Sequence, residues 1–238
     1  MIPLHSTPPR RRVPWVNYAL IGTNTALFVY ELTLGAELTP FIRTHGWVPV
    51  HFSLAMEQGT VPVLMPLFLS MFLHGNWLHL LGNMLFLSFF GGRVEERLGH
   101  CRYLGFYIIG GAVAVFVQTY TMPFSARPMI GASGAVAAVV GVYCIFFATT
   151  REESTSSLLI SRRVALPVVG CIFLWLVLQL GASVAASLED GEGFARSAWW
   201  AHLGGFMAGI AYGSVYLRKR RRRSSRSQSQ SPLVWSDL

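Results

Sequence analysis

Residues 131–134 read Gly-Ala-Ser-Gly and stand where a proline-containing loop runs into a long apolar segment. Pro123 and Pro128 prevent a helix across that loop, because proline lacks the amide hydrogen and clashes with the preceding turn. We therefore expect a helix that begins near Ser133 and runs to about residue 148. The free amides of its first turn would point at whatever approaches the Ser133 hydroxyl. Serine between glycines is also typical of close helix packing in membranes, so these four residues alone do not define a nucleophile.

The composition is that of a membrane protein. Of the 238 residues, 53% are hydrophobic and 13% are charged, whereas soluble domains carry roughly 25% charged residues. A net charge of +8 would suggest nucleic-acid binding in a soluble protein, but here the arginines gather at the borders of apolar runs. We assign the charge to membrane topology and expect no nucleic-acid partner. The three cysteines do not form the pattern of a disulfide framework.

The sequence contains six apolar runs of 14 to 23 residues, compared with about 20 residues that a helix needs to cross a bilayer. They cover residues 15–34, 77–90, 103–121, 133–148, 164–186 and 198–217. The first is longer than the core of a signal peptide, about 7–15 residues, so we predict that it is retained. The predicted fold is an all-α bundle of six transmembrane helices. The chain then divides into an N-terminal tail (1–13), a six-span domain (14–217) and a basic, disordered tail (218–238).

The positive charges predict the orientation in the membrane. Cytoplasmic loops are enriched in lysine and arginine. With the N-terminus in the cytoplasm, sixteen of the 19 lysines and arginines fall on the cytoplasmic side, and only Arg43, Arg127 and Arg196 fall on the other. We thus expect an integral multi-pass protein with both termini cytoplasmic and with Ser133 toward the opposite face.

His202 stands just inside the outer end of the last predicted span, at a depth similar to that of Ser133. Ionisable residues inside membranes are costly and mark functional sites. Each of the two is followed at helical spacing by small residues: Ala137 and Gly141 on one helix, Gly205 and Gly209 on the other. Such a pattern lets two helices approach closely, which would bring the imidazole to the serine as an activating base. The other interpretation of His202 is a packing histidine bonded to a backbone carbonyl.

The second predicted span contributes His79 and Asn83, and His74 stands shortly before it. His79 and Asn83 are four residues apart and share a helix face, so two hydrogen-bond donors converge as an oxyanion hole requires. Metal binding is the rival interpretation, but zinc takes three or four ligands and no acidic or cysteine partner is expected at that depth. We predict no metal and no cofactor.

In combination these motifs resemble the rhomboid family of intramembrane serine proteases, over residues 15–217. Residues 131–134 resemble the family's nucleophile motif, and His202 with Gly205 and Gly209 resembles its base motif. The set His74, His79 and Asn83 is similar to its second-span pattern. Residues 95–99, Glu-Glu-Arg-Leu-Gly, are similar to the loop motif that follows it.

The resemblance implies that Ser133 is the nucleophile, that His202 is the general base, and that His79 and Asn83 stabilise the oxyanion together with the Ser133 amide. It implies structural roles for His74, Glu95, Arg97, Gly99, Gly131, Gly134, Gly205 and Gly209. The implied activity is cleavage of transmembrane protein substrates within or near their spans, in a bacterial-type cell membrane, with membrane lipids as the surrounding partner.

Two positions depart from the family pattern. Met65 and Pro66 stand where many members carry a Trp-Arg pair, and Ala137 stands where many carry an aromatic residue that stacks on the histidine. Neither change removes a group that does chemistry, so we predict an active endopeptidase. The alternative is a non-catalytic membrane binding protein or small transporter that uses the same polar cluster to hold a ligand.

We predict a serine–histidine dyad without a third, acidic member. Of the eleven acids, Glu31 alone lies within a predicted span. A charged acid buried beside His202 would be expensive in a membrane unless it were paired.

Overall fold

The computed structural model describes residues 13–148, 170 and 199–229. Five of its longer helices are α1 (Trp15–Thr33), α5 (Trp77–Phe86), α7 (His100–Thr121), α8 (Ser133–Ala148) and α10 (Trp199–Ser229). Shorter elements are η1 (Gly35–Glu37), α2 (Leu38–His45), α3 (Pro49–Glu57), α4 (Met65–Leu69), η2 (Ser70–Phe72), η3 (Leu87–Gly91) and α6 (Gly92–Leu98). The fold is mostly helical, as predicted. The predicted N-terminal tail, almost all of the fifth predicted span and the last residues of the C-terminal tail lie outside the described residues.

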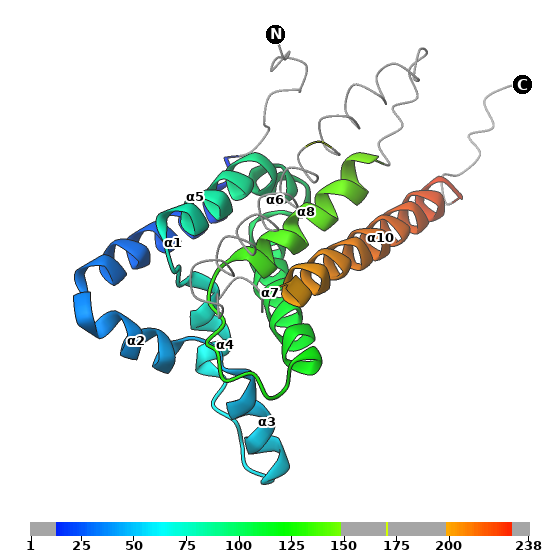
Figure 1. Ribbon diagram of the computed structural model, residues 1–238. Coiled ribbons are helices and arrows are strands. Elements are labelled where there is room, and N and C mark those ends of the chain that lie inside the picture. Colours follow the sequence, from blue (N-terminus) through cyan, green and yellow to red (C-terminus); the bar gives the residue numbers. More distant parts are fainter. Residues whose placement is uncertain (1–12, 149–169, 171–198, 230–238) are drawn as a thin grey trace, which may run out of the picture.

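Helix α8 is the centre of the bundle (Figure 1). Its side chains from Ala135 to Val140 are almost wholly buried, and it packs against α7 and α10. A helix that is apolar all round must be surrounded by other elements or by lipid. Because it begins at Ser133, as the sequence predicted, the serine lies at one end of this buried core.

Glycines let α8 and α10 approach closely. A Cβ atom at Gly205 would lie 2.1 Å from the Gly134 carbonyl oxygen, and one at Gly209 would lie 2.1 Å from that of Ala138. Two positions of the predicted stripe on α8 are therefore shifted by one residue, since Gly134 and Ala138 take the places expected for Ser133 and Ala137. Gly141 meets α10 as predicted, because a Cβ atom there would clash with the Phe206 carbonyl oxygen. The backbones meet beside the serine, which leaves the Ser133 side chain room for a partner from α10.

The helical segment that contains the second predicted span extends beyond the apolar run 77–90. Asn76 starts α5 because its side chain accepts the His79 amide at 2.8 Å, an N-cap that satisfies one free amide of the first turn. The helical path then passes through a π-turn in η3 and through α6 to Leu98. It ends at Gly99, whose φ of 82° is unfavourable for other residues.

The long first loop folds onto the Ser133 end of the bundle. The Trp47 amide and carbonyl pair with Met129, and the Trp47 indole donates to Thr119 Oγ1 at 2.8 Å. Met65 is exposed, and Pro66 occupies the first turn of α4, where proline fits. Trp47 thus ties this loop to α7 and to the segment that precedes α8.

Helix α10 corrects the prediction for the C-terminal tail. Residues 218–229 continue the helix to Ser229 instead of forming a disordered segment. Arginine and lysine are good helix formers, and the apolar part of α10 supplies the nucleus on which they add turns. Cations near a helix C-terminus are also favoured by its dipole.

Within the described residues, α7 is the one helix both long and apolar enough to cross a membrane by itself, and Ser133–Phe146 forms a shorter apolar helix. The number of six spans therefore remains a prediction. Apolar content alone is a poor guide to the number of membrane-spanning helices. Helix α1 shows the reason, because its buried residues include the polar Asn17, Asn24 and Glu31.

Candidate active site

Ser133 and His202 meet between α8 and α10. The imidazole Nε2 of His202 lies 2.8 Å from Ser133 Oγ, a hydrogen-bond distance. Both residues are buried, with 5% and 7% of their surface exposed. With Nε2 unprotonated, the serine hydroxyl donates to it, which is the arrangement that lets a base withdraw the proton of a nucleophile. The structure thus brings together the two residues that the sequence singled out.

His79 lies against the loop that leads to Ser133. Gly131 has a φ of 119°, and a Cβ atom there would lie 2.6 Å from His79 Nε2. The Gly131 amide donates to the Ser70 carbonyl at 2.8 Å, which holds this strained turn in place. Glycine is required here both for its backbone conformation and for the close approach of the imidazole.

Asn83 and His74 bind each other. The Asn83 side-chain amide donates to His74 Nε2 at 3.0 Å, and His74 Nδ1 donates to the Phe72 carbonyl at 3.3 Å. Burial, assisted by His79, lowers the pKa of His74 to about 3, so this imidazole is neutral at physiological pH. The Asn83 amide carries two protons, one of which this bond uses. His74 and His79 also make an edge-to-face contact with ring centroids 5.1 Å apart.

Glu31 supports this group from α1. Its carboxylate, which is buried, accepts the His74 backbone amide at 3.1 and 3.2 Å. From the sequence alone, Glu31 is distinguished only as the one acid within a predicted span. A solitary acid in an apolar helix is itself a signal of a specific partner, because an unpaired charge there is costly.

Gln118 of α7 is a site residue that sequence reasoning missed. Its Oε1 accepts the Ala201 amide at 3.1 Å, and its side chain is almost wholly buried. The first amides of a helix have no partner within the helix, so Gln118 satisfies one of them directly before His202. A lone glutamine in an apolar run was the available signal, but its partner is 83 residues away in the chain.

Residues 62–219 match the sequence model of the rhomboid domain. The chain belongs to the rhomboid family. It is 30% identical over 147 residues to RHOMBOID-like protein 5 of Arabidopsis thaliana, a match that covers 61% of this chain and 41% of the relative. It is 31% identical over 150 residues to presenilin-associated rhomboid-like protein A, mitochondrial, of Danio rerio, covering 62% and 36%.

A third relative is the rhomboid protease GlpG of Haemophilus influenzae, 35% identical over 68 residues, which cover 29% of this chain and 34% of the relative. The matches to these relatives thus span less than half of the relatives' own lengths. Rhomboid-family proteins are integral membrane proteins, so membership places this chain in a membrane.

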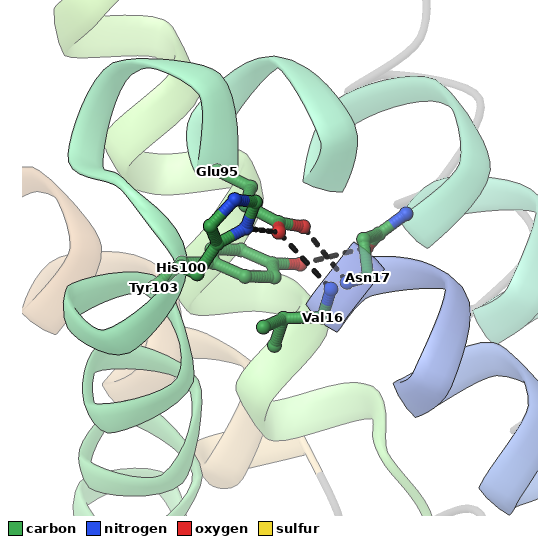
Figure 2. Close-up of polar contacts among 5 residues, drawn as sticks. All are labelled: Val16, Asn17, Glu95, His100 and Tyr103. Atoms are coloured by element: carbon green, nitrogen blue, oxygen red, sulfur yellow. Dashed lines mark hydrogen bonds and ion pairs between the residues drawn. The ribbon is translucent and has the colours of Figure 1, made fainter. Parts of the chain in front are cut away.

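The rhomboid loop motif holds the opposite end of the bundle together (Figure 2). The buried Glu95 carboxylate accepts the Val16 amide at 3.0 Å and the Asn17 amide at 2.8 Å, and it also pairs with His100. The Tyr103 hydroxyl donates to Asn17 Oδ1 at 2.7 Å. Glu95 therefore accepts two amides of the first turn of α1 that have no partner within the helix.

Arg97 joins α6 to the other end of α8. Its Nη1 donates to the Phe146 carbonyl at 2.9 Å, and its guanidinium lies 4.9 Å from the centre of the Phe146 ring. The Arg97 carbonyl in turn accepts the Tyr216 hydroxyl at 3.1 Å. These contacts are with the end of α8 far from Ser133 and involve no group of the Ser133–His202 pair.

Within the described ranges, no group of three or more histidine, cysteine or acidic residues could hold a metal ion.

Proposed function

We propose that this rhomboid-family chain is an intramembrane serine endopeptidase that cleaves transmembrane proteins within or near their spans. The observation that carries the proposal is the 2.8 Å contact between His202 Nε2 and Ser133 Oγ in a buried setting. A packing histidine would bond to a backbone carbonyl instead. That contact also favours an enzyme over a non-catalytic binding protein or transporter.

In the proposed reaction, Ser133 Oγ attacks the carbonyl carbon of the scissile peptide while His202 takes the hydroxyl proton. His202 then gives this proton to the departing amine, which leaves an acyl-enzyme. Water attacks the ester, again with His202 as base, and releases the acid and free Ser133. A helical substrate shields its peptide bonds, so it must unwind locally before attack.

Negative charge develops on the substrate carbonyl oxygen both when Ser133 attacks and when water attacks. Hydrogen-bond donors must be in place to stabilise it. The Ser133 amide belongs to the first turn of α8, where amides lack helical partners. His79 lies against Gly131, two residues before the nucleophile. Asn83 contributes its second amide proton, with His74 and Glu31 fixing its orientation. We propose these three as the oxyanion donors.

The proposed catalytic unit is a dyad. The two acids buried in the described residues have other tasks: Glu31 accepts the His74 amide, and Glu95 caps α1 at the opposite end. In this arrangement His202 is oriented by its helix, which Gln118 and the glycine contacts hold against α8.

The proposed setting is a cell membrane crossed six times, with both termini in the cytoplasm. Helix α1 supports membrane embedding, because it buries Asn24 and Glu31 while Val29, Tyr30 and Leu32 are exposed. Polar groups facing the bundle and apolar groups facing outward are typical of a helix in lipid.

A fluorophosphonate probe tests the proposal. Detergent-solubilised protein should become covalently labelled at Ser133, and Ser133→Ala and His202→Ala should both abolish labelling. Ser88→Ala is the matched control, since Ser88 Oγ bonds the Met84 carbonyl away from the site. A folded wild-type sample that is not labelled, or one labelled equally after Ser133→Ala, would contradict the assignment.

A further inference from the structure

Basic side chains from three helices gather at the end of the bundle opposite to Ser133. We call Arg97 of α6, Arg102 of α7, and Arg218, Lys219 and Arg220 of α10 the inner basic cluster. Arg102 and the three α10 residues are exposed, and Arg97 is half-buried. The three helices meet there, since the Tyr216 hydroxyl donates to the Arg97 carbonyl and α10 packs on α7.

The cluster is compact as well as basic. Arg220 lies one helical turn beyond Tyr216, which contacts Arg97. Burial lowers the pKa of Arg97, and the charge of Arg220 lowers it further. Arg102 lies one helical turn before Phe106, whose ring centre is 4.7 Å from that of Tyr212 on α10. Holding like charges together costs energy that a bound anion would offset.

The length of α10 places this cluster at a defined depth. Trp199 and Trp200 begin the helix and are exposed, and tryptophan prefers the membrane–water interface. Arg218 follows Trp200 by a rise of about 27 Å, close to the roughly 30 Å thickness of the hydrocarbon core. With α10 crossing the membrane as proposed above, the cluster lies at the other interface, at the level of the lipid phosphates.

The helical continuation to Ser229 fixes these side chains to a rigid support. Residues on a flexible tail would lose conformational freedom on binding, whereas residues on a continuing helix have already lost it. Exposed apolar side chains stand nearby on the bilayer side of two of these helices, Leu104 on α7 and Val215 on α10. A lipid would fit such a surface, because its headgroup would bind the basic side chains and its acyl chains would cover the apolar ones.

We propose that the inner basic cluster binds the negatively charged phosphate headgroup of a membrane lipid, with the acyl chains lying along α7 and α10. Guanidinium groups bind phosphate oxygens in pairs, and basic pockets between helices at the cytoplasmic face suit acidic headgroups. The proposal concerns a site distinct from the Ser133–His202 pair, and it stands whether or not the chain is a protease.

Native mass spectrometry of the full chain in detergent tests it. Wild-type protein should retain phosphatidylglycerol over phosphatidylcholine. Each lysine or arginine strengthens binding to an anionic lipid surface by about fivefold, so Lys219→Gln with Arg220→Gln should weaken retention by about 25-fold. The matched control is Arg43→Gln with Arg127→Gln, which removes the same charge at the Ser133 end and should retain the lipid. Circular dichroism checks that both variants are folded.

Equal retention by the two double variants, or no preference for phosphatidylglycerol in the wild type, would overturn the proposal. Displacement of the lipid by millimolar inorganic phosphate would also overturn it, because the cluster would then be a site for the free anion. Ser133→Ala should bind phosphatidylglycerol as the wild type does. This last measurement separates failure of the lipid site from failure of the proposed activity.

Discussion

The bond from the Ala201 amide to Gln118 fixes α10 one residue before His202. Gln118→Met keeps the length of the side chain but removes the acceptor, which leaves a buried amide unsatisfied. A small displacement of a catalytic group is costly, so the rate of fluorophosphonate labelling should fall between about 10- and 100-fold. Gln118→Glu keeps an oxygen at this place and should restore part of the rate.

Thr119→Val is the control for this position. It removes the hydroxyl that accepts the Trp47 indole and donates to the Val115 carbonyl, two bonds that involve no residue of α10, and it should label like the wild type. Wild-type labelling by Gln118→Met would show that α10 is positioned without this bond.

For Glu31, a supporting role and a catalytic role predict different losses of turnover on substitution. Glu31→Gln keeps an oxygen that accepts the His74 amide, so turnover should stay within about tenfold of the wild type, whereas loss of a catalytic acid costs about ten-thousand-fold. Glu31→Leu removes the acceptor altogether and should lower the free energy of unfolding by about 1.5–3 kcal/mol. Turnover and denaturant unfolding in detergent measure the two effects. A catalytic loss of the larger size in Glu31→Gln would identify a third catalytic member.

The α8–α10 pair is the element-scale feature on which the site depends. Gly205→Ala would place a methyl group 2.1 Å from the Gly134 carbonyl oxygen, and such overpacking costs about 1–3 kcal/mol. The matched control is Gly82→Ala in α5, where a Cβ atom meets nothing within 4 Å. That change should be neutral or slightly stabilising, since alanine is the better helix former. Equal unfolding midpoints for the two variants would mean that α8 and α10 can move apart to accommodate the methyl group with little loss of stability.

The elements differ in how far the sequence could predict them. The start of α8 at Ser133 was predictable because prolines and glycines act locally, and so was the pairing of Ser133 with His202. The continuation of the second span to Leu98 was not, because it depends on a π-turn and on contacts of Glu95 and Arg97 with distant helices. The bond of Gln118 to Ala201 was missed for the same reason.

The one-residue shift at two positions of the small-residue stripe has a different origin. Helical spacing shows which residues share a face, but two neighbouring faces of α8 both carry small residues. Which of them contacts α10 depends on where the His202 side chain must go, and that is settled only when the two helices are packed.

At the scale of the whole molecule, the polar groups separate into two ends. Ser133, His202 and Gln118 lie at one end, where the first loop is tied down by Trp47. Glu95 and the inner basic cluster lie at the other end, since Glu95 contacts the start of α1 and Arg97 contacts the last turn of α8. A buried apolar α8 joins the two. We propose that the excess of positive charge places the second end in the cytoplasm.

Thiol labelling tests that orientation. Cys101 is exposed near the start of α7, at the end that carries the inner basic cluster, and Ala126 is exposed in the segment between α7 and α8, at the Ser133 end. In a chain with Cys144 and Cys171 replaced by serine, an impermeant thiol reagent added to intact cells should leave Cys101 unmodified. After Ala126→Cys in a Cys101→Ser background, the same reagent should react, because the charge count predicts sixteen of the 19 basic residues on the cytoplasmic side and residue 126 on the other. Permeabilised cells should show both cysteines reactive. Modification of Cys101 and protection of the residue-126 cysteine in intact cells would reverse the orientation and place the Ser133–His202 pair on the cytoplasmic side.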